Sequence, residues 1–111
     1  MTREERILQL PFFQDKRELA QQILNIEQQE GKYLPNQFAI KQVPPYTFGE
    51  KQAVIGRVHE FYFIGIYSGN KWKYQAFADV IHCRSFFIGL PGIIDQQLAF
   101  WFNNLELLAV S

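Results

Sequence analysis

The fold is decided by residues 56–83, GRVHEFYFIGIYSGNKWKYQAFADVIHC. Two runs rich in β-branched and aromatic residues flank Gly69 and Asn70. Both residues tolerate the positive φ that a two-residue hairpin turn requires, so this stretch is predicted to form a long β-hairpin. The sheet is expected to be centred on residues 61–66 and 72–81, with the hairpin ladder continuing to His59 opposite Val80. The rest of the chain is expected to cover or extend the hairpin.

The two faces of this predicted hairpin differ in polarity. In a two-residue register one face is apolar and sets large side chains against small ones, as at the pair Gly65–Tyr74, which suits a covering helix. The other face is mixed and carries Tyr62 opposite Phe77, so it is expected to be half solvated or partly covered by another strand. A three-residue loop would shift the register by one residue and exchange these faces.

Length and composition indicate one α+β domain spanning residues 1–111. Hydrophobic residues make up 48% of the chain and aromatic residues 16%, which is enough for a core without disulfides or a metal. Basic and acidic residues balance at 11 each. This balance removes the usual electrostatic case for a nucleic-acid partner and leaves little repulsion to oppose a homo-oligomer.

The cysteine content and the hydropathy pattern indicate a cytoplasmic protein. Cys83 is the single cysteine of the chain, so no intramolecular disulfide can form. The first residues carry charges without an uninterrupted apolar stretch, and no segment approaches the roughly 18 apolar residues of a membrane span. The sequence therefore predicts neither secretion nor a membrane partner.

The segments around the hairpin predict helices at both ends. Residues 16–31 have an apolar stripe at helical spacing and should lie on the apolar face of the hairpin, with Asp15 and Glu18 as a capping box. Residues 85–89 are predicted to be a third strand. Apolar positions 94, 98, 101, 105 and 108 predict a C-terminal helix, although Asn103 and Asn104 could instead form a turn between two strands. The expected fold is an N-terminal helix on an antiparallel sheet, closed by a C-terminal helix.

Few residues are candidates for chemistry. His59 and His82 would lie diagonally on one face of the hairpin, but two imidazoles are fewer ligands than a zinc site normally has. Cys83 should point to the opposite face from His82 and behave as a small hydrophobe. No metal or cofactor is expected.

The best catalytic candidate is a pair of carboxylates. In the two-residue register Glu60 lies directly opposite Asp79, and two adjacent carboxylates can raise the pKa of one of them. His59 and His82 would complete such a site. A shifted register, or lysine and arginine side chains from elsewhere, would remove the effect.

Exposed aromatic residues are the candidates for an interface. Tyr67 and Trp72 lie beside the hairpin turn, and Phe100 and Trp101 lie in the C-terminal segment. Aromatic side chains are enriched at protein–protein hot spots, although the cluster at residues 100–102 could instead fill the core under the C-terminal helix.

These observations favour a small, non-enzymatic interaction module that binds another protein. The alternative is a small-molecule-binding or enzymatic domain with an apolar pocket around the carboxylate pair. A third hypothesis, nucleic-acid binding through Lys71 and Lys73 at the hairpin tip, is disfavoured by the net charge of zero.

Overall fold

The structure is a computed structural model, and it describes residues 2–43, 45–90, 96 and 99–103. The described chain is α+β, with helices at both ends and a five-stranded antiparallel sheet between them. Its elements are α1 (Arg3–Leu8), a 3₁₀ turn (Pro11–Phe13), α2 (Arg17–Glu30), β1 (Ile40–Gln42), β2 (Tyr46–Phe48), β3 (Lys51–Val58), β4 (Phe61–Ser68), β5 (Lys71–Phe77) and α3 (Val80–Ile88).

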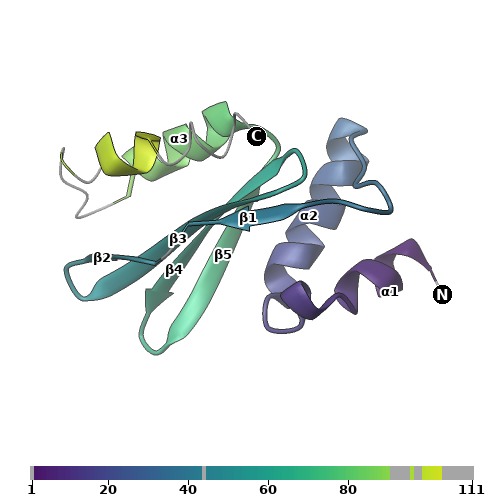
Figure 1. Cartoon of the computed structure of the whole chain (residues 1–111), viewed down its shortest axis with the longest axis horizontal. Helices are drawn as coiled ribbons and strands as arrows, with labels where there is room; N and C mark the ends of the chain where they lie inside the picture. The colour runs from purple at the N-terminus through teal and green to yellow at the C-terminus, as the bar shows by residue number, and fades with distance from the viewer. Residues whose placement is uncertain (1, 44, 91–95, 97–98, 104–111) are drawn as a thin grey trace.

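The strands lie in the order β1-β3-β4-β5, and β2 pairs with the first residues of β3. β1 and β2 therefore share one side of β3, while the β3–β4 hairpin occupies the centre of the sheet. β5 pairs with β4 alone among the described strands, so it is an edge strand of the sheet (Figure 1).

The predicted hairpin turn and its register are confirmed. The ladder between β4 and β5 runs from Ser68–Lys71 to Tyr62–Phe77, with Gly69 and Asn70 at φ angles of 62° and 66°. The pairing of large with small residues is also confirmed, because a Cβ on Gly65 would lie 2.5 Å from Cε1 of Tyr74.

The first strand of the predicted hairpin is interrupted by a second turn. His59 and Glu60 connect β3 to β4, whereas the sequence predicts one strand through both residues. His59 has a φ of 54°, a left-handed value at which Gly or Asn is the usual residue. Because neither loop residue is Gly or Asn, the sequence carries no conventional signal for this turn.

The second predicted strand ends early, and the predicted third strand does not form. Residues 80–88 are helical instead, so both expectations are wrong. Asp79 is the reason, because its extended backbone and side chain form an N-cap that accepts the backbone N–H of His82 at 2.9 Å. The β-branched and aromatic residues of this segment favour strand locally, and the cap and tertiary packing override that propensity.

The sheet face covered by α2, here called the α2 face, has the predicted apolar core. Leu19 and Ile23 of α2 are fully buried with Phe63 and other sheet residues. α2 ends at Gly31, whose φ of 70° is the predicted helix-terminating conformation. The predicted capping box does not form, because Lys16 is the N-cap residue and the Asp15 carboxylate pairs with its amine.

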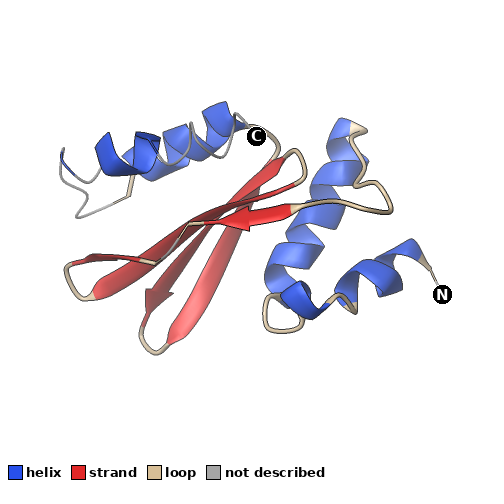
Figure 2. Ribbon diagram, in the orientation of Figure 1, coloured by secondary structure: helices blue, strands red, loops and turns tan. Residues whose placement is uncertain are grey.

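The opposite face, here called the α3 face, carries a second core. Cys83 and Phe87 of α3 lie with Tyr62 and Phe77 of the sheet, and Trp101 completes the cluster. The face predicted to be half solvated is thus covered by a helix at Tyr62 and Phe77 and exposed at Lys73 and Gln75. Figure 2 shows α3 and α2 on opposite sides of the sheet. Residues 99–103 are helical as predicted, and predicted helix positions 94, 98, 105 and 108 lie outside the described residues.

Candidate functional site

The predicted carboxylate pair is not assembled in the ladder. The register between β4 and β5 ends at Tyr62–Phe77, so Glu60 lies in the β3–β4 turn and Asp79 lies at the start of α3. The physical reason is the N-cap, which takes Asp79 out of the sheet. Glu60 and Asp79 are thus assigned to two different local structures.

Asp79 and His82 form a local pair instead. The imidazole Nδ1 of His82 lies 2.8 Å from one carboxylate oxygen of Asp79, and the backbone N–H of His82 donates to the same atom. This backbone hydrogen bond, followed by the His82 ring, holds the pKa of Asp79 below its usual value. A carboxylate with a lowered pKa is the reverse of the raised pKa expected of a general acid, and it stabilises the N-terminus of α3.

His59 lies in a basic hollow of about 390 Å³ together with Lys41 and Arg57. Lys41 and Arg57 pair directly across β1 and β3, and Arg57 Nε donates to the backbone carbonyl of His59. The Arg57 guanidinium also lies 5.7 Å from the ring centre of Tyr62. His59 lies in the β3–β4 turn and His82 in α3, so the ladder that would make them diagonal neighbours does not form.

Cys83 is buried and chemically quiet. Its burial raises its pKa to about 12, and the charge of Asp79 acts in the same direction. A thiol with so high a pKa carries almost no thiolate at neutral pH, as expected of a structural cysteine. Within the part of the chain that the structure describes, no three His, Cys, Asp or Glu side chains are grouped to hold a metal ion.

The aromatic residues predicted at an interface have different environments. Trp101 is fully buried, so it is a core residue and offers no surface to a partner. Phe100 is 47% exposed, with its ring stacked on Tyr46. Tyr67 and Trp72 are half-buried at the turn end of the hairpin, and the centres of their rings are 5.3 Å apart.

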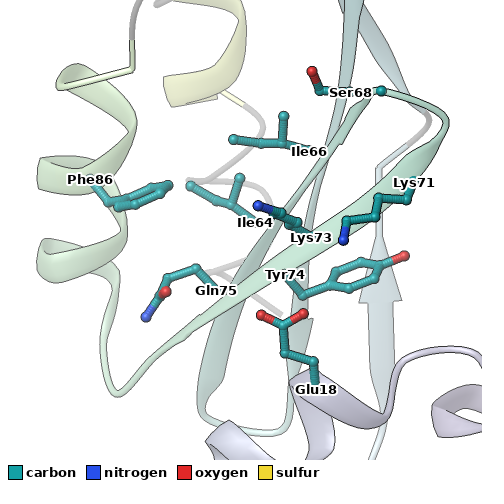
Figure 3. Close-up of a pocket in the computed structure, with 10 residues that line it drawn as sticks. Glu18, Ile64, Ile66, Ser68, Lys71, Lys73, Tyr74, Gln75 and Phe86 are labelled. Atoms are coloured by element: carbon teal, nitrogen blue, oxygen red, sulfur yellow. The ribbon is translucent and has the colours of Figure 1, made fainter.

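A groove beside β5 has a volume of about 510 Å³. Figure 3 shows Phe86 of α3 facing Ile64 and Ile66 of β4, with Lys73 between these side chains and the edge strand. The groove then passes around β5 to the α2 face. Its lining residues are Glu18, Ile64, Ile66, Ser68, Gly69, Lys71, Lys73, Tyr74, Gln75 and Phe86.

The groove is polar along one side and apolar along its floor. Ile64 is buried and Ile66 is half-buried, so the floor continues the core under α3. Lys71 and Lys73 are exposed and lie on the α3 face of β5. Phe86 is 37% exposed at the boundary between the covered and open parts of the sheet.

Among the described residues, the outer backbone edge of β5 is closed over one half only. Ser68 and Lys71 flank a two-residue turn, so alternate residues Trp72, Tyr74 and Ala76 turn their N–H and C=O groups outward. The side-chain amide of Gln22 in α2 donates to the carbonyl of Tyr74 at 2.8 Å and accepts the N–H of Ala76 at 2.7 Å. Gln22 thus occupies two of the outward backbone groups that a neighbouring strand would use.

A comparison with protein families gives a match over nearly the whole chain. The model of the family described as "Protein of unknown function (DUF3964)" matches residues 2–108. The chain belongs to this family. No curated protein and no solved structure matches this DUF3964 protein. Among the described residues, no helix of this family member has the length and apolar character that crossing a bilayer requires.

From the sequence, Lys71 and Lys73 of this DUF3964 protein were candidates only for a disfavoured nucleic-acid contact at the hairpin turn. The contributions of Gln22, Glu18 and Phe86 to the groove and its edge were missed. Gln22 is one of several glutamines on α2, and nothing in its local sequence distinguishes it. Its role depends on a contact 54 residues away, at the Ala76 amide. The site arises because α2 and α3 pack against β5 from opposite faces of the sheet.

Proposed function

We propose that this protein is an interaction module that binds a segment of another protein in the groove beside β5. The observation that carries the proposal is the coincidence of an open strand edge with a groove that has an apolar floor. A strand edge offers directional hydrogen bonds, and the adjoining groove offers apolar surface to the side chains of a bound segment.

The occupant is inferred to be a different protein and not a second copy of this chain. A second copy paired at the same edge would bring a second Lys71 and Lys73 to the same groove, and like charges in adjacent strands are destabilising. Lysine on an edge strand is also a common protection against self-pairing. The same two charges attract a segment that carries carboxylates.

A non-enzymatic role is part of the proposal. It is supported by the different local structures of Glu60, in the β3–β4 turn, and Asp79, at the start of α3, and by the burial of Cys83. The single buried cysteine is also in keeping with the reducing cytoplasm, which is the compartment we propose.

Selection from a library of random displayed peptides tests this function. Peptides are selected on the wild-type protein and then screened against the double variant Lys71→Glu/Lys73→Glu. The matched control is Lys32→Glu/Lys51→Glu, which places the same charge change outside the groove lining. We expect peptides that bind the wild type and the control and lose binding to the groove variant.

Two results would contradict the proposal. The first is a selection that yields no binding peptide. The second is a set of peptides that bind the groove variant as tightly as the wild type. Light scattering on the wild type completes the test, because a dimer abolished by the groove variant would make a second copy the occupant.

A further inference from the structure

We infer that the bound segment is a short β-strand that alternates acidic with apolar residues and pairs with β5 over Lys71 to Tyr74. This inference rests on the proposed function and specifies the chemistry of the partner. It follows from the register of β5, the charges on each face and the position of Gln22.

The open part of the edge sets the length of the pairing. Outward-facing groups begin at Trp72, and Gln22 already holds the carbonyl of Tyr74 and the N–H of Ala76. The N–H and C=O of Trp72 and the N–H of Tyr74 remain directed towards the groove side of the edge. A partner strand can therefore make three backbone hydrogen bonds before it meets Gln22.

The α3 face of the added strand favours acidic residues. Side chains that lie directly across a ladder share a face of the sheet, so alternate residues of the partner come to lie beside Lys71 and Lys73. A Glu or Asp at these positions pairs with the lysine amines. The aliphatic parts of the two lysine side chains can lie on Ile66.

The α2 face of the added strand favours apolar residues. Here the neighbours are Trp72 and Tyr74, whose rings stack at 6.1 Å with an interplanar angle of 16°. Glu18 also lines this side, and its carboxylate would repel an acidic residue. The two faces together specify the pattern acidic, apolar, acidic along the bound strand.

Defined peptides test this pattern. The probe is a capped heptapeptide that alternates valine and glutamate, and its control is a peptide of the same composition with the valines and glutamates in two blocks. A third peptide carries N-methyl groups on alternate backbone amides, which removes strand pairing and leaves the charges in place. Affinities are measured by the emission of Trp72 in the Trp101→Phe background, and the site is mapped from the backbone amide signals of residues 71–76.

We expect the alternating peptide to bind about tenfold more tightly than the block peptide and the N-methylated peptide, the ratio that one or two hydrogen bonds supply. The Lys71→Glu/Lys73→Glu variant should reverse the preference and select a peptide that alternates valine and lysine. If Trp101→Phe does not fold, the wild-type amide signals alone give the affinities.

The outcomes separate this inference from the proposed function. One outcome is that library peptides need Lys71 and Lys73 while the alternating, block and N-methylated peptides bind with equal affinity. This outcome would contradict strand addition but support the interaction module. A library without groove-dependent peptides would overturn both.

Discussion

The two ends of β5 have opposite surroundings, although they belong to one seven-residue strand. At the Ala76–Phe77 end, α3 covers one face and Gln22 closes the backbone edge. At the Lys71–Lys73 end, the side chains are exposed or half-buried and β5 pairs only with β4 among the described strands. The difference teaches that one strand can stabilise the domain at one end and present a binding edge at the other.

The largest expected effect is a difference in stability between substitutions at the covered end and at the open end of the α3 face. Trp101→Ala should lower the free energy of unfolding by about 3–5 kcal/mol, because its fully buried side chain would leave a cavity. Ile66→Ala, at the open end, should lower it by less than about 1.5 kcal/mol because part of this side chain is already in water.

Urea denaturation followed by circular dichroism measures both values, and light scattering reports the oligomeric state. If both variants lost the same free energy of unfolding, the open end of the α3 face would be as well covered as the end beneath α3. A dimer that Trp101→Ala splits into folded monomers would contradict the burial of Trp101 within its own chain.

The next effect concerns the backbone edge. Gln22→Ala should lower the free energy of unfolding by about 1–3 kcal/mol, because it leaves the carbonyl of Tyr74 and the N–H of Ala76 without their partner. Gln21→Ala is the matched control, since Gln21 is exposed and bonds only within α2 to Asn25, and it should change stability by less than about 0.5 kcal/mol. Identical urea midpoints for both variants would show that Gln22 does not close the edge.

How much of this contrast could be predicted depends on where each signal lies in the chain. The turn at Gly69 and Asn70 is encoded locally, and so is the apolar stripe of α2, so the hairpin register and the α2 face were predicted correctly. The turn at His59 lacks Gly and Asn, and it could have been suspected only because a strand from 57 to 68 would exceed the usual length of about 3–10 residues. Asp79 before an apolar run was the available signal for α3.

The groove itself could not be predicted from the sequence. It requires Gln22 and Phe86 to lie on either side of β5, and both placements depend on how the helices pack on the sheet. Trp72, predicted at an interface, lies beside the groove, where its ring stacks on Tyr74. Trp101, also predicted at an interface, is instead a fully buried core residue. Local patterns identified strands and turns, but not which half of an edge remains open.

The smallest expected effect is a pH dependence at Tyr74, where the closed and open halves of β5 meet. Burial, followed by the charge of Asp15, raises the pKa of Tyr74 above its ordinary value. The unfolded chain therefore loses this proton first, and the stability linked to Tyr74 is fully present below about pH 10 and is lost as the pH rises through the folded-state pKa.

Unfolding free energies of the wild type and Tyr74→Phe between pH 8 and pH 11 would measure this dependence. We expect a shallower alkaline loss of stability in Tyr74→Phe than in the wild type. Parallel curves for the two proteins would mean that Tyr74 is solvated like the open end of the strand.

Native-state hydrogen exchange of the β5 amides tests the half-open edge most directly. The outward amide of Ala76, bonded to Gln22, should exchange slowly, whereas the outward amides of Trp72 and Tyr74 should exchange rapidly. The alternating peptide should then slow the exchange of Trp72 and Tyr74 and leave Ala76 unchanged. Slow exchange at all three amides in the free protein would contradict the account, because it would mean that the whole edge of β5 is already occupied.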